Sequence, residues 1–310
     1  MNKIGDLDVF PLCLGGNVFG WTAGKERSFE ILDAYAAAGG NFIDTSDSYM
    51  ASAPGNSGGE SETIIGEWTE ARGNRDDVVI ATKVGKHPER EGLAPDNIKA
   101  AVDDSLRRLR TDRIDLYYTH FDDPSVPVEE IMTALDELVT AGKVRQIAVS
   151  NIELDRLEAS LEFSEREGTA RYAAIQPHYN LVSRDTYEGP RRDLAQRYGL
   201  AALPYYGLAS GFLTGKYRPG ADVDSVRSGK AARHLETERG RNVLAALDIV
   251  AEEQGVAVAT AALAWLAAQP TVVAPIASAR TLDQLPPLIE AARTTLTDAQ
   301  LERLSEASAR

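Results

Sequence analysis

The chain has a single cysteine, four histidines and no long apolar run. Cys13 has no second cysteine to pair with, which excludes an intramolecular disulfide and a cysteine-based zinc site. The histidines show no HExxH-type spacing, so we expect no metal site. The most apolar stretch, 256–268, is shorter than the roughly 18–20 residues that a membrane-spanning helix needs.

Basic residues are scarce relative to acidic ones. There are 33 Lys and Arg against 47 Asp and Glu, which gives a formal net charge of −14. That charge repels nucleic acid and anionic membranes, so we expect neither as a partner. The first ten residues lack the apolar stretch of a signal peptide, and together with the single cysteine this predicts a cytoplasmic protein.

Short apolar runs alternate with amphipathic helical stretches along the 310 residues. The expected strands are 12–14, 41–43, 78–81, 114–118, 144–149, 172–175, 200–203 and 271–275. Strands that alternate with helices predict a parallel sheet, and eight such units favour a closed (β/α)8 TIM barrel. We expect one domain over residues 1–310, with a long loop near 205–234.

A doubly wound open sheet is the alternative fold. It would carry a GxGxxG fingerprint between its first strand and first helix. The glycines at 15, 16 and 20 do not have that spacing, which favours the barrel.

Polar residues recur just beyond the ends of the expected strands. They are Asp44, Lys83, His120, Ser150, Asn151, Gln176 and Ser278. In a barrel these positions face one rim, where active sites are built. Any one of them would equally suit a solvated loop or a helix N-cap, Ser150 above all. Their repetition at several strands predicts a site.

Four residues in three short segments resemble the motifs of a known family. Asp44 and Tyr49 lie in NFIDTSDSY, Lys83 in ATKVG and His120 in DLYYTH, which resembles the catalytic tetrad of the aldo-keto reductases. AGKVRQIAVSN, IQPHYNLVSR, LASGFLTGKY and PIASARTLDQL are similar to further family segments, so the resemblance spans nearly the whole chain. It implies reduction of an aldehyde or ketone, such as a sugar or another small carbonyl compound, with NADP(H) or alternatively NAD(H).

The residue types of this tetrad suit proton donation to a carbonyl oxygen. A phenol with an ordinary pKa of about 10 is protonated at neutral pH, so Tyr49 is the expected acid. Lys83 would favour the phenolate and ease proton release, and Asp44 would hold Lys83 in place. His120 would hydrogen-bond the carbonyl oxygen.

The resemblance also implies a cofactor site. Ser150, Asn151 and Gln176 would hold the carboxamide and Tyr205 would stack on the ring. Lys216 and Arg218 would help to cover the pyrophosphate, and Arg280 with Ser278 would bind the 2′-phosphate. The full expected set is Gly16, Asn17, Asp44, Ser150, Asn151, Gln176, Tyr205, Gly207, Leu208, Ser210, Gly211, Lys216, Arg218, Ser278, Arg280 and Gln284.

Three positions depart from the family pattern. Tyr206 and Gly207 replace a usual Ser-Pro, and Phe121 replaces a frequent Arg. Residues 287–288 are Pro-Leu where a Glu-Asn pair often contacts the adenine, which leaves the strictness of NADP over NAD open.

The expected substrate contacts are two apolar side chains and two members of the tetrad. They are Trp21, Phe121, Tyr49 and His120, although Trp21 would equally suit ordinary packing at the rim.

Two other function classes remain at this stage. Some family members are regulatory or redox-sensing subunits that bind cofactor and turn over slowly, although an intact tetrad argues against a purely binding role. A barrel glycosidase is weaker, because no second rim carboxylate accompanies Asp44. The sequence leaves open the substrate, the physiological direction and the oligomeric state.

Overall fold

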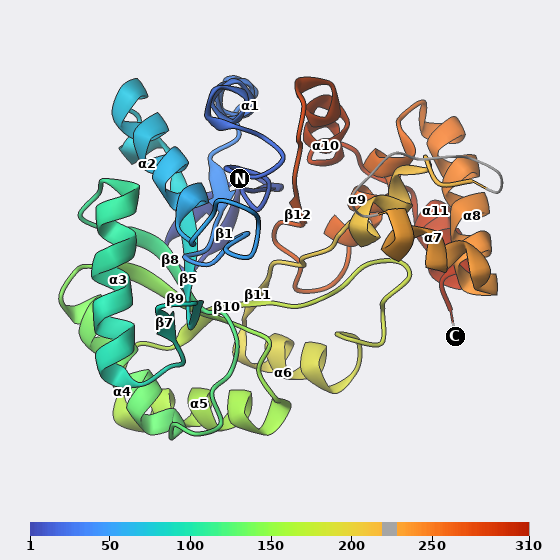
Figure 1. Ribbon diagram of the computed structural model, residues 1–310. Helices are drawn as coiled ribbons and strands as arrows, with labels where there is room; N and C mark the ends of the chain where they lie inside the picture. The colour runs from blue at the N-terminus through green and yellow to red at the C-terminus, as the bar shows by residue number, and fades with distance from the viewer. Residues whose placement is uncertain (219–227, 310) are drawn as a thin grey trace.

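Eight parallel strands form the central sheet of the protein, with helices outside it (Figure 1). The computed structural model describes residues 1–218 and 228–309. The strands are β3 (Cys13–Gly15), β4 (Phe42–Asp44), β5 (Val79–Val84), β8 (Ile114–Thr119), β9 (Val144–Ser150), β10 (Tyr172–Gln176), β11 (Ala201–Ala202) and β12 (Ile276–Ala277). They follow the order β11-β10-β9-β8-β5-β4-β3-β12.

Backbone hydrogen bonds join the two ends of this sheet. The amide of Val273 donates to the carbonyl of Ala202 over 3.0 Å, and the amide of Ile276 donates to that of Pro204 over 2.9 Å. Because these bonds connect the β11 edge with the β12 edge, the sheet curls into a barrel, and the predicted (β/α)8 fold is confirmed.

The helices return the chain between successive strands. They are α1 (Lys25–Ala37), α2 (Glu60–Arg72), α3 (Pro95–Leu109), α4 (Val128–Thr140), α5 (Leu154–Glu167), α6 (Pro190–Tyr198), α7 (Ser228–Glu236), α8 (Glu238–Gln254), α9 (Val258–Ala267), α10 (Leu285–Ala291) and α11 (Asp298–Ala307). Prolines begin α3 and α6, where a missing N–H costs no intrahelical bond. Within the described ranges no single helix is long and apolar enough to cross a membrane; α8 and α9 pass that test only as a pair bent by 97°.

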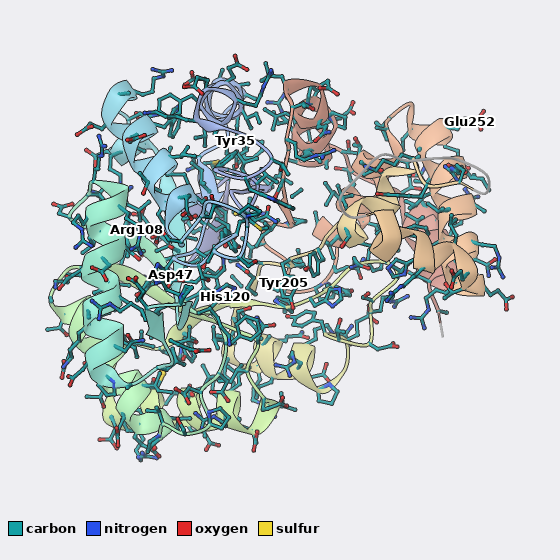
Figure 2. All side chains as sticks on the ribbon, viewed as in Figure 1. Tyr35, Asp47, Arg108, His120, Tyr205 and Glu252 are labelled. Atoms are coloured by element: carbon teal, nitrogen blue, oxygen red, sulfur yellow. The ribbon has the colours of Figure 1, made fainter. Side chains whose placement is uncertain are left out.

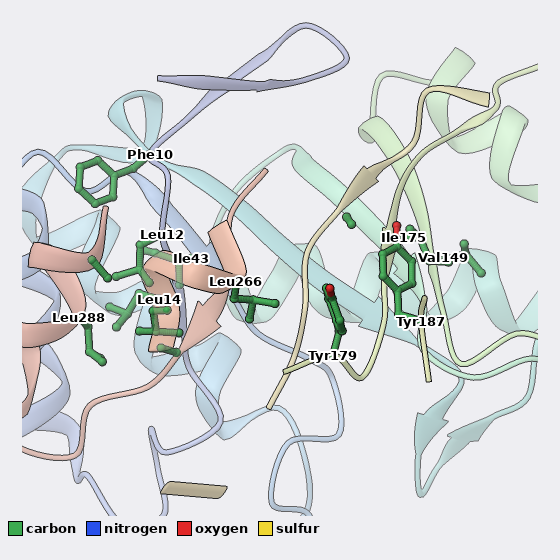
Figure 3. Close-up of a cluster of buried hydrophobic side chains, with 14 of the residues drawn as sticks. Phe10, Leu12, Leu14, Ile43, Val149, Ile175, Tyr179, Tyr187, Leu266 and Leu288 are labelled. Carbon is green, nitrogen blue, oxygen red and sulfur yellow. The ribbon is translucent and has the colours of Figure 1, made fainter. Parts of the chain in front are cut away.

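Two buried clusters separate the inside of the barrel from its helical shell. Leu12 and Leu14 belong to the cluster between strands and helices, part of which Figure 3 shows. Cys13, one position along, belongs to the cluster inside the barrel, as does Phe42 of β4. Successive side chains of a strand point to opposite faces, so residue parity decides which side chains reach the barrel interior.

The last strand differs from the sequence-based expectation. The expected strand at 271–275 makes only a bridge from Val272 to Ala202, and β12 begins at Ile276, where it pairs with β3. Pro270 and Pro275 flank the segment and lack the N–H that a continuous ladder requires.

The expected long loop contains two short helices. A 3₁₀ helix, η2 (Ala209–Thr214), follows β11, and α7 covers Ser228–Glu236. The loop also includes residues 219–227, which lie outside the described residues. Helix α8 begins separately because the Thr237 side chain accepts a hydrogen bond from the amide of Gly240 and caps it.

The sequence analysis also missed two short hairpins. β1 (Asn2–Ile4) pairs with β2 (Leu7–Val9), and β6 (Lys86–His87) pairs with β7 (Arg90–Glu91). Ile4, Leu7 and Val9 join the interior cluster and close one end of the barrel with apolar side chains. Strands of two or three residues are too short to show a hydrophobic period.

Tyr35 ties the first helix to the first two barrel strands. Its hydroxyl oxygen lies 2.6 Å from the carbonyl of Leu12 and 3.0 Å from that of Phe42, and the side chain is buried. Figure 2 places Tyr35 at the α1 side of the barrel.

Tyr35→Phe should lower the free energy of unfolding by about 1–3 kcal/mol, because two buried carbonyls lose their donor. Denaturant unfolding measures this. The control is Tyr198→Phe, a half-buried tyrosine of α6, with an expected change below about 0.5 kcal/mol. Equal effects of the two variants would contradict the role assigned to the Tyr35 hydroxyl.

Candidate functional site

A cavity of about 650 Å³ opens at the carboxyl ends of the barrel strands. Gly15, Asp44, Ser150, Gln176 and Ala277, each at the end of a different strand, line it. Every residue that the sequence analysis assigns to cofactor, substrate or catalysis lines this cavity except Gly16, Lys83 and Arg218. The structure therefore brings residues spread over most of the chain to one place.

The three exceptions have different surroundings. Gly16 donates its amide to the carbonyl of Asp44 over 2.7 Å, which fixes the first loop against the site. Lys83 lies fully buried beneath the cavity floor. Arg218 forms an ion pair with Asp248 of α8, so its guanidinium is engaged outside the cavity.

Two buried side chains, Asp44 and Lys83, meet the partly exposed Tyr49 at the inner end of the cavity. Lys83 Nζ lies 2.7 Å from Asp44 Oδ1, 2.8 Å from Asp44 Oδ2 and 2.7 Å from the carbonyl of Thr45. The Tyr49 hydroxyl oxygen lies 2.7 Å from Lys83 Nζ and donates to Asp44 Oδ2 over 2.6 Å. Gln176 Nε2 donates to Asp44 Oδ1 over 2.8 Å.

Strand parity explains why these residues converge. Asp44 shares a strand face with Phe42, and Lys83 shares one with Ala81; both apolar residues point into the barrel. β4 and β5 are neighbours, with Asp44 paired to Ala81 in the ladder. The Lys83 side chain needs only to cross to the adjacent strand to reach the carboxylate.

The protonation of Tyr49 follows from this burial. Burial raises the pKa of Tyr49 well above its ordinary value, and the charge of Asp44 adds in the same direction. Burial lowers the pKa of Lys83, and Asp44 opposes that shift. The expected lowering of the Tyr49 pKa by Lys83 is thus outweighed, and the phenol keeps its proton at neutral pH.

His120 occupies the cavity wall next to Tyr49, with ring centroids 6.1 Å apart. Burial lowers the pKa of His120 well below its ordinary value, and the cations of Lys83 and Lys86 lower it further. The ring is therefore neutral at pH 7 and carries one N–H. Figure 2 shows His120 and Tyr205 near the centre of the strand ends.

A polar network links this wall to the next strands. Asn151 Nδ2 donates to the His120 carbonyl over 2.9 Å, and Asn151 Oδ1 accepts from the Tyr205 hydroxyl over 3.0 Å. Ser150 Oγ donates to the carbonyl of Gln176 over 2.8 Å. The amide-bearing side chains are thereby held in fixed positions along the cavity.

The other end of the cavity is basic. Lys216 and Arg280 both line it, and the amide of Arg280 donates to Gln284 Oε1 over 2.9 Å, which fixes that turn. Ser278 Oγ donates to Asn17 Oδ1 over 2.6 Å.

The backbone of η2 is left-handed at Ala209, Ser210 and Gly211, with φ of 47°, 58° and 97°. The amides of Ala209 and Gly211 donate to the carbonyls of Tyr206 and Leu208 and hold the loop in this shape, and non-glycine residues with positive φ are found in functional loops. The side-chain amides of Asn151 and Gln176 lie beside the tetrad, and the cations Lys216 and Arg280 line another part of the cavity. This arrangement fits an elongated ligand that carries phosphates.

Eight further lining residues were not assigned to the site by the sequence analysis: Gly15, Val18, Thr214, Ala257, Ala259, Ile276, Ala277 and Asp283. Thr214 and Asp283 lie inside two of the segments that resemble the family. Those segments pointed to the site, but nothing singled out these two positions within them. Ala257 and Ala259 begin α9, and no chemical group in their side chains could reveal them.

The chain matches the aldo/keto reductase family over residues 11–309. The chain belongs to the aldo/keto reductase family. It is therefore an NAD(P)H-dependent oxidoreductase that acts on small carbonyl compounds or on the corresponding alcohols.

Several fungal relatives are similar to this aldo/keto reductase over almost its full length. A norsolorinic acid reductase of Emericella nidulans is 33% identical, with 99% of this chain and 80% of the relative covered. An aryl-alcohol dehydrogenase (NADP+) of Phanerodontia chrysosporium is 33% identical, with coverage of 97% and 83%. A putative aryl-alcohol dehydrogenase of Saccharomyces cerevisiae is also 33% identical, with coverage of 98% and 84%.

Lys83→Met should destabilise this aldo/keto reductase by about 3–5 kcal/mol, because it leaves Asp44 as a buried charge without its cation. Chemical denaturation at pH 7 measures the loss. Lys99→Met is the matched control, since the ion pair of Lys99 with Glu137 is exposed to solvent and should contribute little to the free energy of unfolding. Equal losses of unfolding free energy in the two variants would show that the buried ion pair stabilises the protein no more than the exposed one.

Proposed function

We propose that this aldo/keto reductase reduces an aldehyde or ketone with NADP(H), with Tyr49 as the proton donor. The observation that carries the proposal is the position of the Tyr49 hydroxyl on the cavity wall, within hydrogen-bond distance of both Lys83 and Asp44. The family membership supports the reaction class, and the proposal adds the donor and the cofactor. We also propose that residues 1–310 act as one domain.

When bound, the nicotinamide supplies or accepts a hydride. The carbonyl oxygen gains negative charge as the carbon is reduced, so a donor at that oxygen lowers the barrier. Tyr49 would transfer its phenolic proton there, and Lys83 would stabilise the phenolate that remains. Asp44 keeps Lys83 charged and in place. The neutral ring of His120 would donate a second hydrogen bond to the same oxygen.

The cofactor would lie along the cavity from the tetrad to the basic end. Ser150, Asn151 and Gln176 are fixed by hydrogen bonds beside the tetrad and suit an amide group. Tyr205 offers a ring face on the same wall. The loop at Ser210 and Gly211 with Lys216 suits the pyrophosphate, and Arg280 suits the 2′-phosphate. Arg218 would help to cover the pyrophosphate on leaving its partly exposed ion pair with Asp248.

The mouth of the cavity supports an aromatic substrate. Trp21, Phe121 and Tyr206 line it, and Phe121 and Tyr206 are 42% and 47% exposed. Aromatic rings favour flat apolar ligands through stacking and edge contacts. Two of the relatives are named as aryl-alcohol dehydrogenases, which agrees with an aryl aldehyde or its alcohol as the substrate class.

A regulatory subunit that only binds cofactor is the alternative function. The complete hydrogen-bonded set of Asp44, Tyr49 and Lys83 favours turnover over binding alone. NADPH consumption with a panel of aromatic and aliphatic aldehydes, measured beside NADPH binding, separates the two. Tight binding without consumption of NADPH for any aldehyde would favour the regulatory function.

Tyr49→Phe should reduce the rate of carbonyl reduction at least about 10²-fold, the low end for general acid catalysis. NADPH binding should stay nearly unchanged, because the ring is kept. Steady-state kinetics and fluorescence titration measure the two quantities. Tyr206→Phe, which removes a hydroxyl from the rim of the same cavity, should retain turnover of the same order. A Tyr49→Phe variant with near wild-type turnover would exclude Tyr49 as the acid.

Arg280→Ala tests the choice of NADP over NAD. A hydrogen bond to a charged group contributes about 1.5–3 kcal/mol, so the variant should bind NADPH roughly 10- to 150-fold more weakly. NADH has no 2′-phosphate and should bind nearly as before. Asp283 lines the cavity close to Arg280 in sequence, so Asp283→Asn should shift affinity toward NADPH by removing a like charge. Equal losses of both cofactors in Arg280→Ala would remove the support for NADP.

A further inference from the structure

A chain of polar groups continues from the Nδ1 atom of His120. Ser46 Oγ lies 3.3 Å from His120 Nδ1 and 3.1 Å from Asp47 Oδ1. Ser46 and Asp47 are buried, with 0% and 1% exposure. Figure 2 shows Asp47 next to His120. A hydroxyl both donates and accepts, so Ser46 can connect the carboxyl group to the ring.

Within the part of the chain that the structure describes, Asp47 forms no ion pair, since Lys83 pairs with Asp44 and Arg108 with Glu62. The nearby acid Glu62 of α2 already accepts from Arg108 Nε of α3 over 2.6 Å and from Thr82 Oγ1 over 2.5 Å. Among the described residues, Asp47 Oδ2 has no hydrogen-bond partner. A buried carboxylate oxygen without a partner disfavours the ionised form.

Charged and polar groups from several elements influence the pKa of Asp47. Glu62 disfavours the ionised form, whereas Arg108, Ser46 and Ser48 favour it, and burial outweighs them. Lys83 of β5 and Tyr117 of β8 also interact electrostatically with Asp47. The ring of His87 in β6 and the backbone carbonyl of Asp47 both lie next to Gly58. The result is a pKa of Asp47 raised to about 7.

We propose that Asp47 and Ser46 form a proton relay that sets which ring nitrogen of His120 carries the hydrogen. The two are positioning residues, and the proposal rests on the proposed function because it concerns the nitrogen that would face the carbonyl oxygen. With Asp47 protonated, its O–H donates to Ser46, and the Ser46 hydroxyl donates to Nδ1. Nε2 then carries the hydrogen and can donate to a carbonyl oxygen.

With Asp47 ionised, the direction of the chain reverses. Nδ1–H donates to Ser46, whose hydroxyl donates to Asp47 Oδ1, and Nε2 becomes an acceptor for an alcohol O–H. In this change one proton leaves Nε2 for water in the cavity, while the Asp47 proton moves through Ser46 to Nδ1. One proton is lost overall and no bond to carbon changes. Low pH therefore favours reduction, and high pH favours alcohol oxidation.

The His120 tautomer can be read directly by NMR of the protein labelled with 15N in its imidazole rings. His120→Gln identifies the resonances among the four histidines. In the wild type the hydrogen should move from Nε2 to Nδ1 as pH rises through about 7. Asp47→Asn and Ser46→Ala should abolish this change. Ser48→Ala, the control in the same turn, should retain it at a higher midpoint, because Ser48 favours the carboxylate.

Kinetics provide the second readout. Ser46→Ala should lower kcat/KM for reduction by about 2- to 10-fold, the effect of one neutral hydrogen bond. Asp47→Asn should remove the decline of kcat/KM for reduction that accompanies the ionisation of Asp47 near pH 7, and Ser48→Ala should retain it. This result is independent of Tyr49→Phe, which should lower turnover at least about 10²-fold and leave the His120 tautomer change intact.

Protein stability gives a third, independent measurement. The pKa of Asp47 rises from 3.8 to about 7 on folding, so the folded state binds more protons in that range. Its stability relative to Asp47→Asn should fall as pH rises from about 4 to about 7, and then level off. A tautomer of His120 that is independent of pH in the wild type, or a change that persists in Asp47→Asn, would overturn the relay.

Discussion

The buried contact between Lys83 and Asp44 is the constraint on which the site depends. Removing two charges from water costs several kcal/mol per ion, so the pair persists only where other groups complete its hydrogen bonds. The carbonyl of Thr45, the Tyr49 hydroxyl and the Gln176 amide do this here. The same contacts that make the burial tolerable also orient the Tyr49 phenol, so the stability of the buried charges and the position of the phenol depend on each other.

The barrel satisfies this constraint through register. A slip of one residue in β4 or β5 would turn the charged side chain toward the helical shell and bring an apolar one inside. The apolar hairpin β1–β2 closes the opposite end of the barrel, so the buried charges meet water only through the cavity. Chemistry is thus confined to the carboxyl ends of the strands, where loops such as 205–218 shape the cavity without altering the floor.

The regular elements were predictable from the sequence, because hydrophobic periods of 2 and 3.6 are visible in a single chain. The ordered motifs also pointed to residues that the structure gathers around one cavity. The amphipathic helical stretches that the sequence predicts are present, for example at Glu60–Arg72 and Leu154–Glu167. β12 was placed too early, since prolines at both ends of an apolar run prevent the ladder that its composition suggests. The partner of Arg218 and the direction of the Tyr49 pKa depend on tertiary neighbours, which no local pattern encodes.

The central claim is that Tyr49 delivers the proton to a carbonyl oxygen while the carbon receives the hydride. The most direct measurement is reduction of an aromatic aldehyde with NADPH deuterated at the transferred position, run in H2O and in D2O, for the wild type and Tyr49→Phe. The account predicts deuterium on the alcohol carbon, a slower wild-type rate in D2O, and no such solvent effect on the residual rate of the variant. Loss of the label to solvent, or an equal solvent effect in both proteins, would contradict it.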